Sequence, residues 1–347
     1  MEHGKIRPAE VYPERNKSYC RRSGVAKSNN PGRRPSCLRT SSREYSEQRR
    51  AYILYKIGSS KLDQVRSGRT ISKQNIKLVI MKIDLRNKIA LVTGGSKGIG
   101  RGAAESLAGA GATVYICARN LEEMESVVAG MSAAAGNPVK AIQADVTQQE
   151  DVDCLIETIN SQAGTVDILV NNVGGIGKQV PFEDFPAEDY LSLYDLNVVS
   201  MVRMIKAVVP GMIAKGWGRI INMSSENGLQ PYPDMIPYNL TKAAIINLSK
   251  GLSKLYGKHN ILVNTVSPAF IYTPLVEDML KGQAEQKGIS VQDAQSQFLE
   301  QNRPGIELGR PGTIEEVGAA VVFLASEQAS FITGTNLRVD GGSVSSI

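Results

Sequence analysis

A phenol and an amine stand four residues apart in Tyr238-Asn239-Leu240-Thr241-Lys242. Residues three or four apart lie on one face of a helix, and the apolar residues that follow keep helical spacing. A phenol titrates at about 10 in water, and a neighbouring ammonium lowers that pKa. The pattern therefore predicts a tyrosine that exchanges a proton with a substrate oxygen near neutral pH, although chance alone places this spacing in many helices.

Two more polar residues are candidates for the same centre. Ser225 precedes Tyr238 by 13 residues and follows a predicted strand, and a doubly wound sheet binds its ligands at the carboxyl ends of its strands. The Ser225 hydroxyl is suited to hold a substrate carbonyl. Asn197 lies in a predicted helix interior, where asparagine has only modest propensity; the alternative is an exposed polar residue without a role.

A glycine-rich loop follows the first predicted strand, in the order Thr93-Gly94-Gly95-Ser96-Lys97-Gly98-Ile99-Gly100. Glycine permits a tight turn at position 94, close approach of a pyrophosphate at 98 and close packing of a helix at 100. The following helix directs free N–H groups and the positive end of its dipole at the phosphates. We interpret the loop as a dinucleotide-binding site.

The end of the second predicted strand indicates which dinucleotide binds. A carboxylate there usually holds a ribose 2′-hydroxyl, but this chain has Arg119 followed by Asn120. Arg119 and Lys97 are cations suited to a 2′-phosphate, which favours NADP(H) over NAD(H). The alternative is that both are solvated surface charges.

The elements that must position these residues alternate from residue 87 onward. Short, mostly apolar runs predict seven strands, at residues 89–92, 113–118, 139–144, 168–171, 219–223, 261–266 and 336–339. Helical segments separate them, and two carry apolar stripes made of Leu121, Met124, Val128 and Met131 and of Leu155, Ile156 and Ile159.

Two capping boxes predict helix starts, at Thr147 with Glu150 and at Thr313 with Glu316. The alternation of strands and helices predicts an α/β fold. We expect a doubly wound, Rossmann-type parallel sheet of about seven strands with helices on both faces, in a single domain.

Charge divides the 347-residue chain in two. Residues 1–80 carry 19 Lys and Arg against 6 Asp and Glu, whereas residues 81–347 carry 21 against 28. The basic part lacks sustained periodicity, so we expect a disordered or artefactual extension. The alternatives are an organelle-targeting peptide and translation that begins at Met81. Residues 81–347 are expected to be the folded domain, and nucleic-acid binding is not favoured, because the positive charge lies in a tail without a recognisable binding motif.

Composition excludes several other classes. With 42% hydrophobic and 21% charged residues, the chain is typical of a soluble globular protein, and no apolar run approaches the roughly 18 residues that span a bilayer. We expect a cytoplasmic protein without a membrane segment. Two histidines leave little for a His-based metal site or a Ser-His-Asp triad, and no metal is expected. Cys117 and Cys154 are expected to be buried free thiols.

Together, these motifs resemble the short-chain dehydrogenase/reductase family over residues 87–343. The family's tetrad of Asn, Ser, Tyr and Lys falls on Asn197, Ser225, Tyr238 and Lys242. Valine replaces the alanine of the family's Asn-Asn-Ala-Gly element, and Ala269 replaces a glycine after strand six. The resemblance implies that the cofactor is contacted by Gly94, Ser96, Lys97, Gly98, Ile99, Gly100, Arg119, Asp145, Val146, Asn172, Gly174, Tyr238, Lys242, Pro268, Ile271 and Thr273.

The resemblance also implies an oxidoreductase that moves hydride between a nicotinamide and a carbonyl or alcohol. Tyr238 would donate the proton in reduction and act as the base in oxidation, and Ser225 would steady the developing oxyanion. Lys242 would also bind the nicotinamide ribose, and Asn197 would hold a water that links Lys242 to solvent. The alternatives are an NAD-dependent alcohol dehydrogenase and a non-catalytic dinucleotide-binding regulator.

Partners and substrate follow from the same resemblance. The family commonly forms homodimers or homotetramers through the helices that carry the tetrad asparagine and tyrosine. Members that reduce 3-oxoacyl groups often have basic residues where this chain has Gly216 and His259, so a small or medium ketone is favoured and a carrier-bound substrate stays open. The loop after Asn172 and residues 275–310 should set specificity, the latter as a helical lid or, alternatively, as a surface excursion.

Overall fold

The computed structural model of the chain describes residues 83–178 and 180–346. The expected disordered extension at residues 1–80 and the alternative start at Met81 lie outside the described residues.

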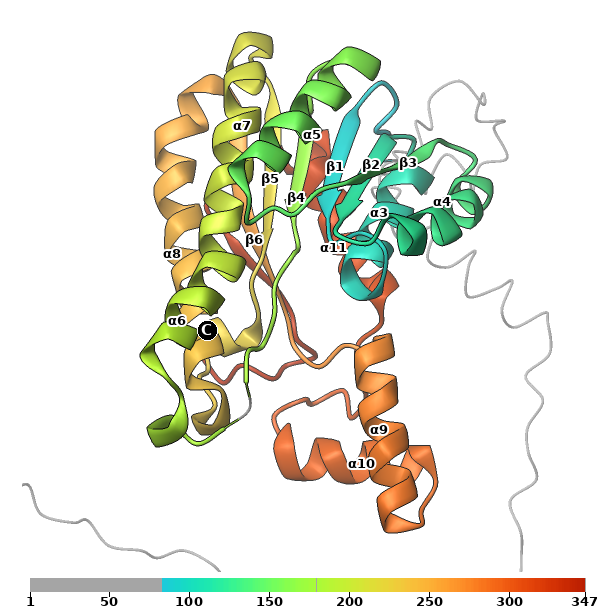
Figure 1. Cartoon of the computed structure of the whole chain (residues 1–347), viewed down its shortest axis with the longest axis vertical. Coiled ribbons are helices and arrows are strands. Elements are labelled where there is room, and N and C mark those ends of the chain that lie inside the picture. The colour runs from blue at the N-terminus through green and yellow to red at the C-terminus, as the bar shows by residue number, and fades with distance from the viewer. Residues whose placement is uncertain (1–82, 179, 347) are drawn as a thin grey trace, which may run out of the picture. The chain divides into compact units, whose positions relative to one another are not determined.

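Seven parallel strands form one sheet in the order β3-β2-β1-β4-β5-β6-β7 (Figure 1). All seven predicted strands are confirmed, with ends that differ by at most two residues. The strands are β1 (Ile89–Thr93), β2 (Thr113–Ala118), β3 (Val139–Gln143), β4 (Ile168–Asn171), β5 (Gly218–Met223), β6 (Ile261–Pro268) and β7 (Asn336–Val339). Because the chain returns from β3 to pair β4 with β1, the strand order reverses at β1 and β4, where such folds bind their ligands.

Helices cover both faces of the sheet, so the Rossmann-type fold is confirmed (Figure 1). One face packs against α3 (Gly98–Gly109), α4 (Leu121–Ala135) and α11 (Ile314–Ala325). The other packs against α5 (Gln149–Gln162), α7 (Ser200–Lys215) and α8 (Ile236–Tyr256). Beyond the strand ends lie α6 (Ala187–Tyr194), α9 (Pro274–Lys287) and α10 (Val291–Asn302). Short helical turns are η2 (Phe182–Asp184), η3 (Asp195–Val199), η4 (Glu226–Gly228), η5 (Pro233–Met235), η6 (Gly257–His259) and η7 (Glu327–Ala329).

One of the two predicted capping boxes is present. Thr313 accepts a hydrogen bond from the Glu316 N–H, and the Glu316 carboxylate accepts one from the Thr313 N–H. The box at Thr147 and Glu150 is wrong, because Asp145 accepts hydrogen bonds from both the backbone N–H and the hydroxyl of Thr147. That local turn keeps Thr147 outside α5, which begins at Gln149.

The predicted burial is wrong for one of the two cysteines. In the first apolar stripe, Met124 and Met131 are buried, whereas Leu121 is 36% exposed at the first residue of α4. Cys117 is buried in the sheet, whereas Cys154 is exposed, because it faces away from the buried Leu155, Ile156 and Ile159 of α5.

One described stretch, Ala187–Lys215, is long and apolar enough by composition to cross a membrane, and an 18-residue window within it has a mean hydropathy of 1.5. Half of that window is buried inside the protein, where α7 contributes Met201, Met204 and Met212 to the core on the sheet. Its apolar character is therefore used to cover the sheet in this fold.

Candidate active site

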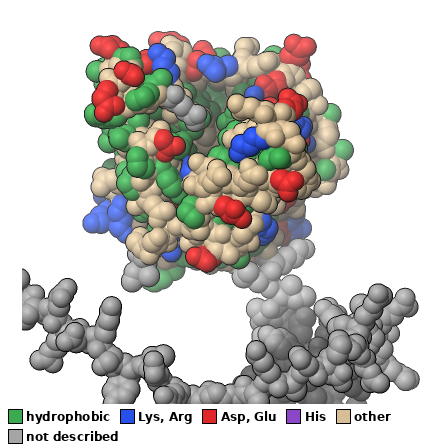
Figure 2. All heavy atoms as spheres, turned by 90° about the horizontal axis from the view of Figure 1, so that it is seen from below, with side chains coloured by type: hydrophobic (Ala, Val, Ile, Leu, Met, Phe, Trp, Pro, Cys, Tyr) green, Lys and Arg blue, Asp and Glu red, His purple; other side chains and the backbone are tan. Residues whose placement is uncertain are grey.

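The predicted catalytic residues converge where β4 and β5 end. Asn197 and Lys242 are 0% and 4% exposed, Ser225 is 7% exposed, and Tyr238 is partly buried. Seen from below, the face of the molecule beyond the strand ends is hollowed, and hydrophobic side chains line much of the hollow (Figure 2). The tetrad thus lies in a water-poor place, where electrostatic interactions are strong.

Asn197 lies in a π-helical turn, η3, that joins α6 to α7. Its Oδ1 accepts a hydrogen bond from the Gly175 N–H at 2.8 Å, and its Nδ2 donates to the Gly175 carbonyl and to Thr241 Oγ1, each at 2.9 Å. A Cβ added to Gly174 would lie 3.1 Å from Asn197 Oδ1 and 3.5 Å from Lys242 Nζ. The alternative of an exposed asparagine is therefore excluded, and π-turns of this kind are frequent at functional sites.

Tyr238 and Lys242 share one face of α8, as their spacing predicts. Lys242 Nζ lies 5.3 Å from the centre of the Tyr238 ring, and Ser225 is close enough to the phenol to influence its pKa. The expected fall in the phenol pKa is not found: burial raises the pKa of Tyr238 to about 12, the Ser225 hydrogen bond opposes this, and the Glu226 charge adds to it. Desolvation is therefore the largest influence on the phenol pKa.

The amine of Lys242 is held by the strand beside it. Lys242 Nζ donates to the carbonyl of Met223 at 3.1 Å, and Ser224 Oγ donates to the carbonyl of Lys242 at 2.8 Å. Burial lowers the pKa of Lys242 from 10.5 to about 8, because a buried ammonium loses its hydration. The amine can therefore change its charge close to physiological pH.

The glycine loop has the shape that a pyrophosphate requires. Gly94 and Gly98 have φ of 65° and 55°, values that residues with a Cβ rarely adopt. A Cβ added to Gly100 would collide with the Gly94 carbonyl. The N-terminus of α3 has no side-chain cap, so its N–H groups remain available to an anion. Asn172 Nδ2 donates to the carbonyls of Thr93 and Gly94, so Asn172 supports the loop itself.

The two predicted phosphate-binding cations differ in their surroundings. Lys97 Nζ lies 3.3 Å from Glu123 Oε1, which also accepts a hydrogen bond from Ser96 Oγ. Arg119, exposed after β2, has no ion-pair partner closer than 4.0 Å within the described residues. The Glu123 carboxylate therefore already pairs with Lys97, which the sequence did not indicate.

The remaining predicted cofactor residues lie around the same edge. Pro268 ends β6, Ile271 is 4% exposed, and Thr273 caps α9 and lies beside Gly98. Val146 is buried after β3, and Asp145 holds Thr147 there. The structure thus brings the predicted cofactor residues from six separate segments to one edge of the sheet, together with Ile99 in the first turn of α3.

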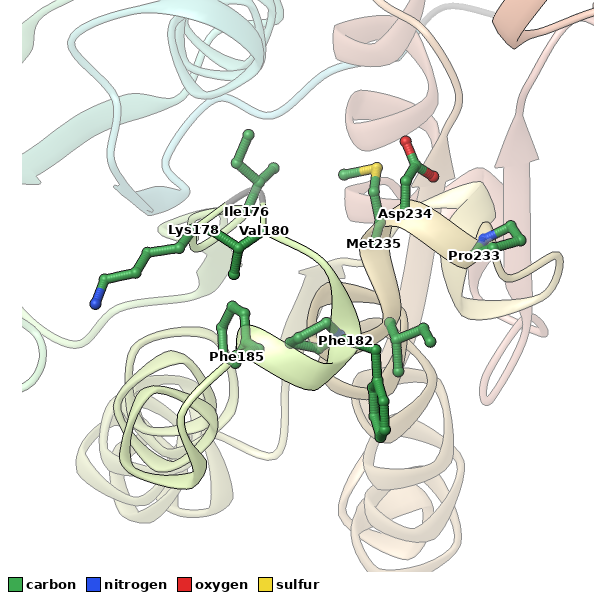
Figure 3. A pocket seen from close by; sticks show the side chains of 10 residues that line it. Ile176, Lys178, Val180, Phe182, Phe185, Pro233, Asp234 and Met235 are labelled. Carbon is green, nitrogen blue, oxygen red and sulfur yellow. The ribbon is translucent and has the colours of Figure 1, made fainter.

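A hollow lies between the loop after β4 and the turn before α8 (Figure 3). Ile176, Val180, Phe182 and Met235 give it an apolar lining, with Lys178 and Asp234 at its edges. Lys178 points away from Met235 (Figure 3) and pairs with Asp189 at 2.7 Å. Pro237, the residue before Tyr238 in the sequence, also lines this hollow.

Known proteins share both the sequence and the fold. A family model described as enoyl-(acyl carrier protein) reductase matches residues 94–344. The 3-oxoacyl-[acyl-carrier-protein] reductase of Chlamydia muridarum is 39% identical over 258 residues, which are 74% of this chain and 98% of that protein. The chain belongs to the short-chain dehydrogenase/reductase family. It is therefore an oxidoreductase of the kind that acts on CH–OH or keto groups.

Solved short-chain dehydrogenases/reductases have the same architecture. L-sorbose reductase from Gluconobacter frateurii, in complex with NADPH and L-sorbose, is 32% identical with a TM-score of 0.73, covering 77% of this chain and all of that one. An NAD⁺-bound xylitol dehydrogenase is 30% identical with a TM-score of 0.67, covering 74% of this chain and 99% of that one. Structures of this fold therefore include complexes with both dinucleotides.

Sequence reasoning missed several polar residues of this short-chain dehydrogenase/reductase. Asn227 and Asn239 are buried beside Ser225 and Tyr238, and Glu226 is 2% exposed and lies 3.4 Å from the guanidinium of Arg303 at the end of α10. Each of these residues is next to or near a motif residue in sequence, but in sequence alone each is typical of an exposed turn or helix surface. Only the folded arrangement shows that they are enclosed.

Proposed function

We propose that this chain is an NADP(H)-dependent oxidoreductase that interconverts a ketone and the corresponding alcohol, with Tyr238 as general acid and base. The proposal rests on one observation above all. Ser225 lowers the pKa of the Tyr238 phenol, and Lys242 Nζ lies 5.3 Å from the centre of the Tyr238 ring, beside a loop whose glycines leave room for a pyrophosphate.

The residues divide the chemistry as follows. When bound, NADP(H) supplies or accepts the hydride at the substrate carbon. In reduction the substrate oxygen gains negative charge and needs a proton, and Tyr238 holds one because its pKa of about 12 keeps the phenol protonated near neutral pH. Ser225 adjoins the phenol and would steady the same oxygen. In oxidation Tyr238 must first lose its proton, which a charged Lys242 favours.

Lys242 and Asn197 would return the proton to Tyr238. The amide of Asn197 is held by Gly175 and by Thr241, the residue before Lys242, so its Oδ1 keeps one lone pair free of these contacts. A water on that lone pair would link Lys242 to solvent, as the family resemblance implies. Lys242 would also bind the nicotinamide ribose.

Arg119 supports the choice of NADP(H). It stands after β2 in the place where an NAD-binding protein usually carries a carboxylate, and its fork of donors suits a 2′-phosphate. The complex of the L-sorbose reductase with NADPH is consistent with this choice. The NAD⁺-bound xylitol dehydrogenase keeps an NAD-dependent alcohol dehydrogenase as the second candidate.

We propose a small or medium ketone as substrate. The hollow before α8 has an apolar lining, and Phe298 of α10 stacks on Phe270 of the loop after β6, with ring centres 4.7 Å apart. This contact supports the proposal that α9 and α10 form a lid. We also propose a cytoplasmic homodimer or homotetramer without a nucleic-acid or membrane partner.

The absorbance of the reduced nicotinamide tests the proposal directly. The purified protein is mixed with NADPH and a panel of ketones and ketoses, and with NADP⁺ and the matching alcohols, with Tyr238→Phe as the inactive control. We expect turnover with at least one ketone that the control lacks. A protein that binds neither NADPH nor NADH would refute the proposed function.

A further inference from the structure

A chain of buried amides leads away from Ser225. Ser225 Oγ donates to Asn227 Oδ1 at 3.1 Å, and Asn227 Nδ2 donates to Asn239 Oδ1 at 2.8 Å. Asn239 Nδ2 then donates to the carbonyl of Tyr232 at 2.7 Å. Asn227 and Asn239 are only 4% and 6% exposed, so these partners replace solvent.

The last member of this chain fixes its direction. A backbone carbonyl only accepts hydrogen bonds, so the Tyr232 carbonyl requires that Asn239 direct its NH₂ group toward it. Asn239 then presents Oδ1 to Asn227, so Asn227 must donate from its own NH₂ group. Asn227 consequently presents an acceptor, Oδ1, to the Ser225 hydroxyl.

The same chain determines what Ser225 can offer to Tyr238. A hydroxyl has one hydrogen and two lone pairs. Its hydrogen is directed to Asn227 Oδ1, and one lone pair accepts the Asn227 N–H at 3.3 Å. Ser225 also contacts the Tyr238 phenol and lowers its pKa, as a hydroxyl does when it donates to the phenol oxygen. The two contacts with Asn227 therefore hold Ser225 Oγ beside Tyr238 while its hydrogen can turn between Asn227 Oδ1 and an oxygen at the site.

We propose that Asn227 is a positioning residue of this active site, which acts by holding the Ser225 hydroxyl against Tyr238, and that Asn239 holds Asn227 in turn. Asn227 lies in η4, directly after β5, and Asn239 follows Tyr238 on α8. The pair of amides therefore joins the strand end that carries the serine to the helix turn that carries the tyrosine. This inference rests on the proposed function.

The first test replaces Asn227 with leucine, which has a similar size and no polar atoms. We expect kcat to fall by about tenfold or more, the effect of one hydrogen bond, while KM and the Kd for NADPH change by less than about twofold. Asn264→Leu is the matched control. Asn264 is 1% exposed and is hydrogen bonded to Ile332 and Thr335, which precede the edge strand β7. It should lower Tm without changing kcat.

A double-mutant cycle distinguishes positioning from general damage. If Asn227 acts through Ser225, Asn227→Leu should change kcat by less than about twofold in a Ser225→Ala background. An equal loss of kcat in both backgrounds would overturn the proposal. Asn227→Asp keeps an acceptor for Ser225 and should retain more kcat than Asn227→Leu; equal activity of the two variants would also count against it.

A crystal structure of Asn227→Leu, or of Asn227→Asp if the leucine variant does not fold, gives an answer that does not require turnover. In the leucine variant, Ser225 Oγ should rotate away from Tyr238, whereas in the aspartate variant it should stay. The opposite result in the variant obtained would overturn the proposal. If the unmodified protein reduces no ketone, the proposed function fails while this structure still decides the role of Asn227.

Discussion

Replacing Lys242 with methionine should remove activity and yet change stability in a way that depends on pH. The amine is 4% exposed, and burial lowers its pKa from 10.5 to about 8. At about 1.4 kcal/mol per pKa unit, holding the charged form inside the folded protein costs about 3 kcal/mol. Methionine fills a similar volume without that cost.

Part of this gain is lost with the contacts of the amine. Lys242→Met leaves the Met223 carbonyl without its 3.1 Å donor, which costs about 1 kcal/mol. It also removes the ammonium that lies 5.3 Å from the Tyr238 ring centre, a contribution of about 1 kcal/mol. At neutral pH the variant should therefore be more stable than the unmodified protein by about 1 kcal/mol.

The difference in unfolding free energy between the two proteins should also depend on pH. Between pH of about 8 and about 10.5 the unfolded chain keeps the lysine proton while the folded protein has lost it, so the unfolded state binds more protons and stability rises with pH. Relative to Lys242→Met, the unmodified protein should gain about 3 kcal/mol across this window. Groups that titrate alike in both proteins cancel in the comparison.

Urea unfolding of both proteins at a series of pH values measures this difference. Lys254→Met, which removes an exposed lysine of the same helix, is the matched control and should follow the unmodified protein at every pH. If the curves for Lys242→Met and the unmodified protein also run parallel, the amine is not desolvated as the structure indicates.

Four further outcomes are expected. Arg119→Ala should weaken NADPH binding at least about tenfold, because a charge-assisted hydrogen bond is lost, and should leave NADH binding unchanged. Fluorescence titration with both cofactors measures this. Equal affinity of the unmodified protein for the two cofactors would contradict the prediction. Tyr238→Phe should keep NADPH binding and lose turnover about a hundredfold or more, whereas near-normal rates would assign the acid elsewhere. Light scattering at micromolar concentration should give the mass of a dimer or tetramer, and a monomer would disprove the proposed assembly. A chain that starts at Met81 should melt at the same temperature as the full chain, unless residues 1–80 pack on the folded domain.

The sequence was sufficient for the fold because its signals are local. Each strand is a short apolar run, and burial on both faces of a parallel sheet requires that pattern. The tetrad could be located for a similar reason, since Tyr238 and Lys242 are one helical turn apart and Ser225 follows a strand. The capping box at Thr147 was missed because a competing local hydrogen bond to Asp145 keeps Thr147 out of α5.

The electrostatics of the site could not be predicted in the same way. Spacing alone places Lys242 near Tyr238 and suggests a lowered phenol pKa, but it contains no information on how much water each group loses. In the folded protein burial dominates, and the pKa of the phenol rises to about 12 while that of the amine falls to about 8. Desolvation depends on the whole surrounding structure, including Glu226, which sequence reasoning did not single out.

Cofactor preference likewise depends on neighbouring charges that the sequence does not show, and binding measurements can test their effect. Charge counting treats Lys97 and Arg119 as equal partners of a 2′-phosphate, yet Glu123 lies 3.3 Å from Lys97 Nζ and also accepts from Ser96. A phosphate that engages Lys97 must compete with that carboxylate and is repelled by it, whereas Arg119 has no carboxylate within 4.0 Å among the described residues, and Asp145 acts on it only from farther away. The preference for NADPH should therefore depend on Arg119 more than on Lys97. Glu123→Gln should accordingly tighten NADPH binding and leave NADH nearly unchanged, and a variant that weakened both cofactors alike would show that Glu123 instead supports the loop.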